Sequence, residues 1–530
     1  MITRGVGGSC LVLAGGLLTA TLPPSTPVLR IALLEELRSH EFGRMLGLVT
    51  VLAGLGLLAS AWIRLSRTIA LGEQGTAEPR EGVALVRFAT AAWTAPLLLA
   101  PPLFSRDGWS YAAQGMLAHV GLSPYRWGPE ALVPQGFFPL PGWLTGPPVV
   151  QAVDPMWFDT ATPYGPLPLV FGSFAAGFTG NPWVLVVAHR CLALVGLALL
   201  AWAVPRLARW TGVNPALAAA LVLASPLMLA NGVAGLHNDL LVVGLMAAAL
   251  VVAAERGWVA GAVVAGLAAG VKVPGGLVCV GIVLVTLPAG AALAVRLRRI
   301  ASVGAVSVGT LLALGVVTGL GSGWAQALLV PGEVNTPLSS TTLVGGWLDW
   351  MAGLVGAGLP PATFLTAVRA LGLLAALALG AWVLLRRPTG DRGVALTATA
   401  LTVAAFVVLS PVVHLWYFLL VSPFVAVLRL PRAAVGAFVG VSLLTGLVAP
   451  LDSSLHGAYY AIVVGSMTVA LLMPLLLLTR GARARLAPVL ASLAPSDDAP
   501  GDEALAGRAE PTRPAEATRP PRDQPASRAR

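Results

Sequence analysis

The sequence predicts an all-α protein that crosses a membrane many times. Of its 530 residues, 57% are hydrophobic and only 11% are charged, whereas roughly a quarter of the residues of a typical soluble protein are charged. Apolar stretches that approach the roughly 20 residues needed to cross the hydrocarbon core recur along almost the whole chain. Such segments are typical of transmembrane helices, so we expect one polytopic membrane domain rather than several soluble ones.

The arginines indicate how these helices are oriented. The formal net charge is +10, and in a soluble protein this charge would suggest a nucleic-acid partner. Here the arginines lie in short segments between apolar stretches, where positive charge sets the orientation in the membrane. We therefore expect no nucleic-acid partner, and we trace the chain with its N-terminus in the cytoplasm.

The transmembrane helices are expected in order along the chain. Together with the arginines, the apolar stretches predict about twelve to fourteen of them. Their approximate positions are residues 6–22, 46–63, 87–104, 183–204, 214–231, 239–254, 257–271, 275–294, 301–319, 364–385, 394–412, 415–430, 433–450 and 457–479.

Two long segments between these helices are predicted to lie outside the cell, at about residues 105–182 and 320–362. The weaker apolar runs within them, 165–178 and 347–359, are short and rich in glycine, so we expect re-entrant or interfacial pieces. From about residue 487 the composition changes to Ala, Pro, Arg, Asp and Glu without apolar periodicity. Residues 1–486 are thus predicted to form the transmembrane domain, and residues 487–530 a disordered cytoplasmic tail.

Asp107 is the first candidate for chemistry. It lies in SRDGWSYAAQG, where the third predicted helix ends and the first external segment begins. A carboxylate in this position, beside Tyr111, can remove a proton from an acceptor hydroxyl. The alternative is an interfacial residue that solvates a helix end, and the aromatic side chains near it have the interfacial aromatic belt as their alternative. Tyr164, in the turn YGP, falls at the same predicted face.

A polar triplet, His237-Asn238-Asp239, begins an otherwise apolar helix at the same face. Helix capping explains Asn238 or Asp239 but hardly all three residues. Metal binding by His237 and Asp239 is an alternative, yet no second pair of ligands with helical spacing accompanies them. The cysteines lie inside apolar segments and lack the spacing of zinc or redox motifs. We therefore predict no metal and no cofactor.

Three basic residues complete the predicted site. Lys272, the only lysine, lies in the hairpin VKVPGG, where a cation can hold a phosphate. Arg190 lies within a predicted helix; snorkelling is one interpretation and a functional site is the other. His414 precedes Trp416 and Tyr417 in a hairpin that can also be read as part of an aromatic belt. A base, several phosphate ligands and aromatic rings on one face favour a site for a membrane-anchored phosphate and a polar acceptor.

Several segments, taken together, resemble a known family. They are DGWSYAAQG, GLSPYRWGPEAL, VDPMWFDTATPYGPLPL, HNDLLVVGL, GVKVPGGL, NTPLS and SPVVHLWYFLLVSP, in this order along the chain. They are similar to the actinobacterial polyprenol-phosphomannose-dependent alpha-1,6-mannosyltransferases of the GT-C superfamily. The resemblance covers roughly residues 45–480.

The resemblance implies a fold, a reaction and site residues. It implies a GT-C fold with a long first external loop, in which an aspartate serves as the catalytic base, and Asp107 is the matching position. It implies a polyprenyl phosphate mannose donor, inversion of configuration, and a lipid-anchored alpha-1,6-mannan acceptor, as in lipomannan assembly in the cell envelope. The active site of this multi-pass cell-membrane protein would face the extracytoplasmic side, and no metal is implied. The substrate-binding residues expected on this reading are Tyr111, Tyr164, Arg190, His237, Asn238, Asp239, Lys272, His414, Trp416 and Tyr417.

Two other functions remain open on the sequence alone. One is a related GT-C enzyme that transfers arabinose or another pentose. The other is a secondary transporter of a polar or lipid-linked solute, in which His237, Asp239 and Arg190 would form a proton or ion path. A transporter needs polar groups near the membrane midplane, whereas the predicted topology gathers them at one face.

Overall fold

The computed structural model describes residues 1–72, 79–133, 147–328, 334–356, 358–451 and 459–493, and its regular elements are helices. The α-helices are α1 (Ile2–Thr19), α2 (Ala32–Ser39), α3 (Glu41–Gly72), α4 (Pro79–Thr94), α5 (Asp107–His119), α6 (Pro148–Ala152), α7 (Pro166–Ala176), α8 (Pro182–Thr211), α9 (Pro215–Leu223), α10 (Asp239–Arg256), α11 (Trp258–Val271), α12 (Cys279–Thr286), α13 (Leu293–Val317), α14 (Trp324–Ala327), α15 (Ser340–Leu354), α16 (Thr363–Arg386), α17 (Arg392–Leu409), α18 (Phe418–Val425), α19 (Arg432–Leu447), α20 (Tyr459–Leu477) and α21 (Arg480–Leu493). The shorter elements are the π-helix η5 (Leu227–Ala234) and the 3-10 helices η1 (Pro27–Arg30), η2 (Ala95–Leu99), η3 (Pro129–Leu132), η4 (Pro155–Trp157), η6 (Val273–Val278), η8 (Leu415–Tyr417) and η9 (Ala449–Leu451).

Seven helical segments among the described residues are long and apolar enough to cross a membrane, which confirms the prediction of an all-helical, polytopic membrane protein. They are Ile2–Thr19, Glu41–Gly72, Arg80–Leu99, Pro182–Thr211, Leu293–Val317, Thr363–Arg386 and Arg392–Leu409. Two bent pairs, Pro215–Leu223 with Leu227–Ala234 and Val463–Leu477 with Arg480–Leu493, raise the number to nine if each pair is one span.

The predicted count of about twelve to fourteen spans stays a prediction. Among the described residues, four further apolar helices of 10–17 residues, α11 among them, lie in regions where the sequence predicts spans, and α7 lies in the run 165–178 predicted to be re-entrant or interfacial. A helix of that length rises about 15–25 Å, whereas the hydrocarbon core is about 30 Å thick. Such helices cross the membrane alone only where the protein surrounds their ends.

The predicted tail and parts of the predicted loops lie outside the described residues. Residues 487–493 belong to α21. The remainder of the tail, with residues 134–146 and 329–333 of the two predicted external segments, is not described. The predicted division at residue 486 therefore stays a prediction.

Helices α8 and α10 approach closely where Gly196 and Gly244 face each other. A Cβ atom added to Gly244 would overlap the backbone of Gly196, and one added to Gly196 would overlap the backbone of Leu240. Small residues allow such close approach between helices in a membrane. The contact holds the helix that carries Arg190 against the helix that begins at Asp239.

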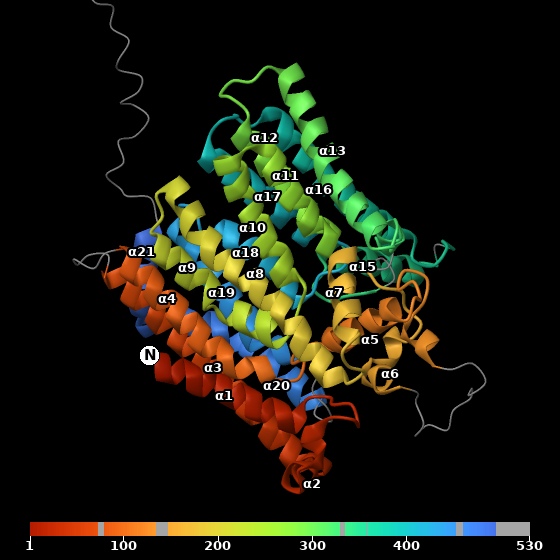
Figure 1. Cartoon of the computed structure of the whole chain (residues 1–530). Coiled ribbons are helices and arrows are strands. Elements are labelled where there is room, and N and C mark those ends of the chain that lie inside the picture. The colour runs from red at the N-terminus through yellow and green to blue at the C-terminus, as the bar shows by residue number, and fades with distance from the viewer. Residues whose placement is uncertain (73–78, 134–146, 329–333, 357, 452–458, 494–530) are drawn as a thin grey trace, which may run out of the picture. The chain divides into compact units, whose positions relative to one another are not determined.

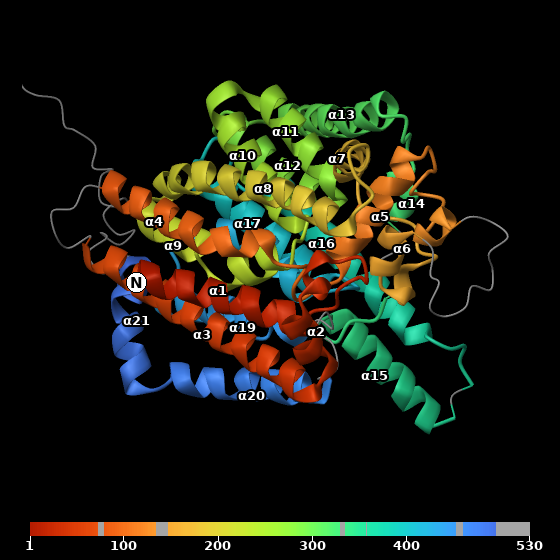
Figure 2. The same ribbon diagram turned by 60° about the horizontal axis from the view of Figure 1, so that its bottom comes forward.

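The segments before α5 and α10 have unusual backbone conformations. Phe104, just before α5, has φ +66°, and Leu236, between η5 and α10, has φ +59°. The left-handed conformation costs a non-glycine residue of order 1–3 kcal/mol, so tertiary contacts must hold both segments. Leu103 N donates a hydrogen bond to the carbonyl of Ala234 over 3.0 Å, which joins the two segments directly. Both views of the chain show α5 on the opposite side of the helix bundle from α21 and the N-terminus (Figures 1 and 2).

Candidate active site

Asp107 is the first residue of α5, and two tyrosines reach its carboxylate. The Tyr164 hydroxyl donates a hydrogen bond to Asp107 Oδ2 over 3.1 Å, and the Tyr111 hydroxyl lies 3.5 Å from the same oxygen. The two hydroxyls are 3.3 Å apart, and the two rings meet edge to face with centroids 5.0 Å apart. Tyr111 is one helical turn from Asp107, and Tyr164 lies just before α7. The segment predicted to form the first external loop thus folds back onto Asp107.

His237 approaches the same carboxylate from a second element. Its Nδ1 lies 3.7 Å from Asp107 Oδ2; the His237 side chain is fully buried, and that of Asp107 is 22% exposed. Burial would raise the pKa of Asp107, but the approach and positive charge of His237, the charge of His414 and the Tyr164 hydrogen bond together lower it to about 2. Asp107 is therefore ionised at neutral pH and can accept a proton.

An aromatic stack extends from His237 to the hairpin at His414. The ring of Trp416 stacks on His237 with centroids 3.7 Å apart and on His414 with centroids 4.2 Å apart. Tyr417 meets Trp416 at a steep angle, with centroids 6.4 Å apart. This stack connects η8, far along the chain, to the carboxylate on α5.

Lys272 forms a buried ion pair with Asp239. Its Nζ lies 3.0 Å from both carboxylate oxygens of Asp239, with the lysine side chain 13% exposed and the aspartate 2% exposed. The same Nζ lies 4.3 Å from the centroid of the Tyr417 ring, in a cation–π contact. Asp239 thus offsets part of the lysine charge, and the role of Lys272 toward a phosphate stays a prediction.

Several buried polar atoms near this cluster have no hydrogen-bond partner among the described residues. They include both ring nitrogens of His237, the amide nitrogen of Asn238 and the indole nitrogen of Trp109. His237 Nδ1 faces the Asp107 carboxylate at 3.7 Å. Because buried polar groups in folded proteins nearly always have a partner, the other atoms of this set suit contacts with a ligand. Asn238 also lines a small hollow, together with Tyr111, Gln114, Tyr164, Pro168, Leu169 and His189.

Gln114 is a site residue that the sequence analysis did not identify. Its Oε1 accepts a hydrogen bond from Thr162 Oγ1 over 3.0 Å, which ties α5 to the segment before Tyr164. Asp107, Tyr111 and Gln114 follow the spacing i, i+4, i+7, so they share one face of α5. That spacing within DGWSYAAQG is the signal that could have found it.

Arg190 contacts backbone carbonyls rather than the tyrosines and histidines of the cluster. Its side chain is only 1% exposed. Its guanidinium donates to the carbonyls of Leu98, Ala100, Pro101, Val233 and Ala234. A guanidinium has five N–H donors, so these carbonyls occupy all of them. The predicted role of Arg190 as a phosphate ligand stays a prediction, and the contacts favour a role in joining the segments that precede Asp107 and His237.

Comparison with known proteins decides the family. Residues 2–288 match the family model described as "Alpha-(1->6)-mannopyranosyltransferase, N-terminal domain", and residues 341–479 match the "MptB C-terminal domain". The chain belongs to the alpha-(1→6)-mannopyranosyltransferase family.

Curated mannopyranosyltransferases align with most of the chain. A probable alpha-(1→6)-mannopyranosyltransferase of Mycolicibacterium smegmatis is 31% identical over 493 residues, covering 86% of this chain and 84% of the relative. Alpha-(1→6)-mannopyranosyltransferase A of Mycobacterium tuberculosis is 31% identical over 473 residues, covering 86% and 85%. Alpha-(1→6)-mannopyranosyltransferase B of Corynebacterium glutamicum is 29% identical over 402 residues, covering 70% and 63%. No solved structure matches the chain.

This mannopyranosyltransferase family member is a glycosyltransferase, as the resemblance in its sequence implied. Family membership confirms the prediction of an enzyme and favours it over a transporter. The predicted site residues come from both matched regions: Asp107, His237 and Lys272 lie within residues 2–288, and His414 and Trp416 lie within residues 341–479. The contacts between them join the two regions into one cluster.

Proposed function

We propose that this mannopyranosyltransferase transfers mannose from polyprenyl phosphate mannose to the 6-hydroxyl of a lipid-anchored mannan, with inversion at the anomeric carbon. The observation that carries the proposal is the Asp107 carboxylate. It is ionised, partly exposed, and held by Tyr164 and His237 beside buried polar atoms that have no partner among the described residues. This arrangement suits a base next to a binding site for a sugar phosphate.

In the proposed reaction Asp107 is the base. The 6-oxygen of the acceptor forms a bond to C1 of mannose while the bond between C1 and the phosphate oxygen breaks. The hydroxyl proton passes to Asp107, and the electron pair of the broken bond leaves with polyprenyl phosphate. Attack opposite the leaving group converts a beta-mannosyl donor into an alpha-linked product. General base catalysis of this kind contributes about 10²–10⁴-fold to the rate.

The remaining residues are proposed to bind donor and acceptor. The leaving phosphate gains negative charge, and cations near it stabilise that charge. We assign this role to Lys272 and His414. The amide nitrogen of Asn238 and Nε2 of His237, which have no hydrogen-bond partner among the described residues, would bind sugar hydroxyls or phosphate oxygens. The rings of Trp416 and Tyr417, which contact His237, His414 and Lys272, would hold these groups beside the substrate.

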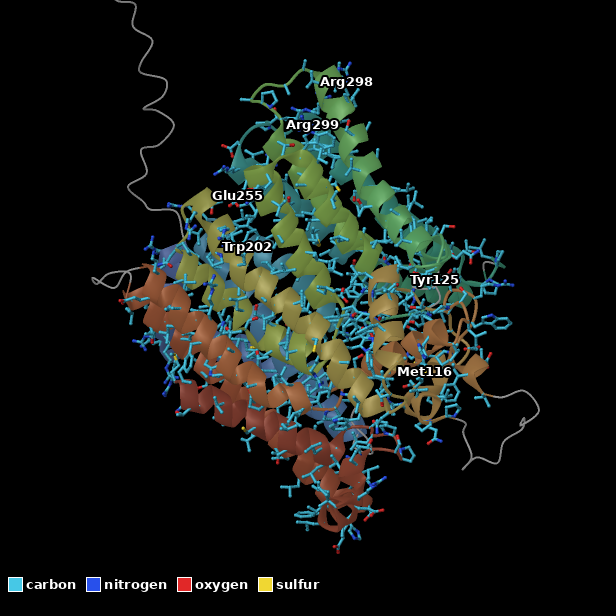
Figure 3. All side chains as sticks on the ribbon, in the orientation of Figure 1. Met116, Tyr125, Trp202, Glu255, Arg298 and Arg299 are labelled. Carbon is cyan, nitrogen blue, oxygen red and sulfur yellow. The ribbon has the colours of Figure 1, made fainter. Side chains whose placement is uncertain are left out.

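The extracytoplasmic location of the site and the GT-C fold are also proposals. Arg298 and Arg299 lie at the tip of α13, far from Met116 of α5 (Figure 3). Arginines favour the cytoplasmic end of spanning helices, so α5 and the Asp107 cluster would face the other side.

The donor assay tests this function. Proteoliposomes that contain the full chain receive an alpha-1,6-mannoside acceptor and either labelled polyprenyl phosphate mannose, a mannose nucleotide or polyprenyl phosphate arabinose. We expect label in an alpha-1,6-linked product from the polyprenyl phosphate mannose donor alone. The absence of product from polyprenyl phosphate mannose would exclude the proposed donor, and product from the nucleotide or the arabinose donor at a comparable rate would contradict the proposed donor selectivity.

A further inference from the structure

A second cavity lies away from the Asp107 cluster. It has a volume of about 710 Å³ and is bounded by α1, α3, the end of α20 and α21. Ligand-binding cavities in proteins are typically about 300–1,000 Å³, so this space can hold a molecule of appreciable size. Figures 1 and 2 show α21 and the N-terminus together on the side of the bundle opposite to α5.

Arginines from three helices line this cavity. Its lining includes Arg4 of α1, Arg64 and Arg67 of α3, and Arg485 of α21, and no acidic side chain among the described residues. Arg4 donates a hydrogen bond to Ser60 Oγ over 2.7 Å. The guanidinium groups of Arg64, Arg67 and Arg485 have no ion-pair partner in the described ranges of the chain. Four like charges around one space indicate an anionic occupant.

Much of the remaining wall of the cavity is aliphatic, with Ser60 and Thr479 as its hydroxyl-bearing residues. The aliphatic part is formed by Ile63 on α3, Leu476 and Leu477 on α20, and Leu486 on α21. Leu476 is 60% exposed, which is ordinary where a side chain faces lipid. A ligand that fills this space therefore has both an anionic group and a hydrocarbon part.

Two arginines elsewhere at the ends of the spanning helices are arranged differently. The guanidinium of Arg206 lies over the Trp202 ring and beside Glu255, 3.9 Å away, and that of Arg299 lies over the Trp258 ring. These side chains have partners within the chain. The arginines of the second cavity instead converge on one space from three different helices.

We propose that this cavity binds an anionic phospholipid of the membrane leaflet opposite the active site. The phosphate contacts Arg64, Arg67 and Arg485, and an acyl chain lies along Ile63 and Leu477. Basic pockets between transmembrane helices on the cytoplasmic side are typical binding sites for anionic lipid headgroups. The guanidinium fork pairs with phosphate oxygens in bidentate geometry. The bound lipid would connect α21, the last described helix, to α1 and α3.

Native mass spectrometry of the purified full chain tests the proposal. The protein is titrated with phosphatidylglycerol or with phosphatidylcholine of the same acyl chains, and bound lipid is counted. Each arginine should contribute about fivefold to the affinity for the anionic lipid. The triple variant Arg64→Gln, Arg67→Gln, Arg485→Gln should therefore lose on the order of a hundredfold. The matching triple lysine variant, which keeps the charge, should lose roughly tenfold or less.

The matched control replaces three exposed arginines away from the cavity, Arg256, Arg298 and Arg386, by glutamine. Its affinity for phosphatidylglycerol should stay within about twofold of the wild type. The proposal would be overturned if both glutamine triples lost the same affinity for phosphatidylglycerol. It would also be overturned if the wild type bound phosphatidylcholine as tightly as phosphatidylglycerol. Displacement of the lipid by inorganic phosphate alone would show that the site selects the phosphate without the acyl chain, and would overturn it as well.

A labelling experiment on the unmodified chain covers the case in which the variants do not fold. Phosphatidylglycerol with a photoreactive group in its acyl chain should crosslink to α3 and to the α20–α21 corner. Crosslinks spread over all lipid-facing helices, without enrichment at these two places, would contradict the assignment.

Discussion

The carboxylate of Asp107 lies between a buried imidazole and two tyrosine hydroxyls, and the imidazole sets its basicity. Burial alone would raise the pKa of Asp107, and His237 is the strongest influence that lowers it. The contact with His237 thus helps to keep Asp107 in the form that accepts a proton. If His237 lowered the pKa of Asp107 less, part of the enzyme would carry a protonated Asp107 in mild acid and would be inactive.

The substitution His237→Gln tests this dependence. Without the imidazole, burial dominates and the pKa of Asp107 rises above its present value of about 2. Because the base acts only when deprotonated, the acid limb of the kcat/KM profile should move to higher pH in the variant. The kcat/KM of the wild type should not fall through protonation of Asp107 above about pH 4. His119→Gln, an exposed histidine at the end of α5, is the control, and superimposable profiles for all three proteins would contradict the account.

Lys272 and Asp239 form the other charged pair of the site. Removal of one partner from a buried pair leaves an uncompensated charge, at a cost of about 3 kcal/mol. Lys272→Met should therefore lower thermal stability, and the double variant Lys272→Met, Asp239→Asn should recover most of it. The donor KM should stay raised in the double variant if Lys272 contacts the phosphate. Recovery of both stability and donor KM would assign Lys272 to the ion pair alone.

At the scale of elements, the site depends on how α8 joins the segments before α5 and α10. Arg190 reaches carbonyls at residues 98–101 and 233–234, the two segments that contain or adjoin the left-handed residues Phe104 and Leu236. We therefore propose that Arg190 is a positioning residue, which acts on Asp107 and His237 through the backbone.

The substitution Arg190→Lys replaces five donors in a fixed plane by three on a single nitrogen. The segments that precede α5 and α10 should relax. Displacement of a catalytic group by about 1 Å can cost about 10²-fold in rate. We expect kcat to fall by about 10–100-fold with donor KM nearly unchanged. Arg206→Lys on the same helix, where the arginine bonds one carbonyl and lies near Glu255, should retain wild-type kcat. A rise in KM without loss of kcat would instead point to direct phosphate binding by Arg190.

The length of each helix decides whether the sequence alone predicts that it crosses the membrane. Long spans such as α3, α8 and α13 stand out because each contains an apolar window of 18 residues within a longer helix. Short helices such as α11 and α18 have the same composition, and only tertiary packing decides whether each crosses the membrane. The π-helix η5 leaves no signal in an apolar sequence.

At the scale of the molecule, the polar side chains of an apolar chain are easily found, but their pairing is not. The sequence predicts that Asp107, His237, Lys272 and His414 lie at one face, and the structure places them in a connected cluster. The sequence does not predict that Asp239, 33 positions away, is the partner of Lys272. The carbonyl partners of Arg190 lie up to 92 positions away, so its role depends on tertiary structure.

The cluster draws residues from both matched regions of the chain. Trp416, from the C-terminal region, stacks on His237 from the N-terminal region and on His414. Neither region alone contains Asp107 together with the aromatic stack. We propose that this joint cluster acts through Asp107.

The transfer rate of Asp107→Asn in proteoliposomes, with polyprenyl phosphate mannose and an alpha-1,6-mannoside acceptor, tests that claim most directly. The account predicts a fall in kcat of about 10²–10⁴-fold, with donor KM within about twofold of the wild type because the amide keeps the shape of the side chain. Asp159→Asn, an exposed aspartate in the same predicted external segment, should keep the wild-type kcat. An Asp107→Asn enzyme that transfers mannose at the wild-type rate would contradict the account.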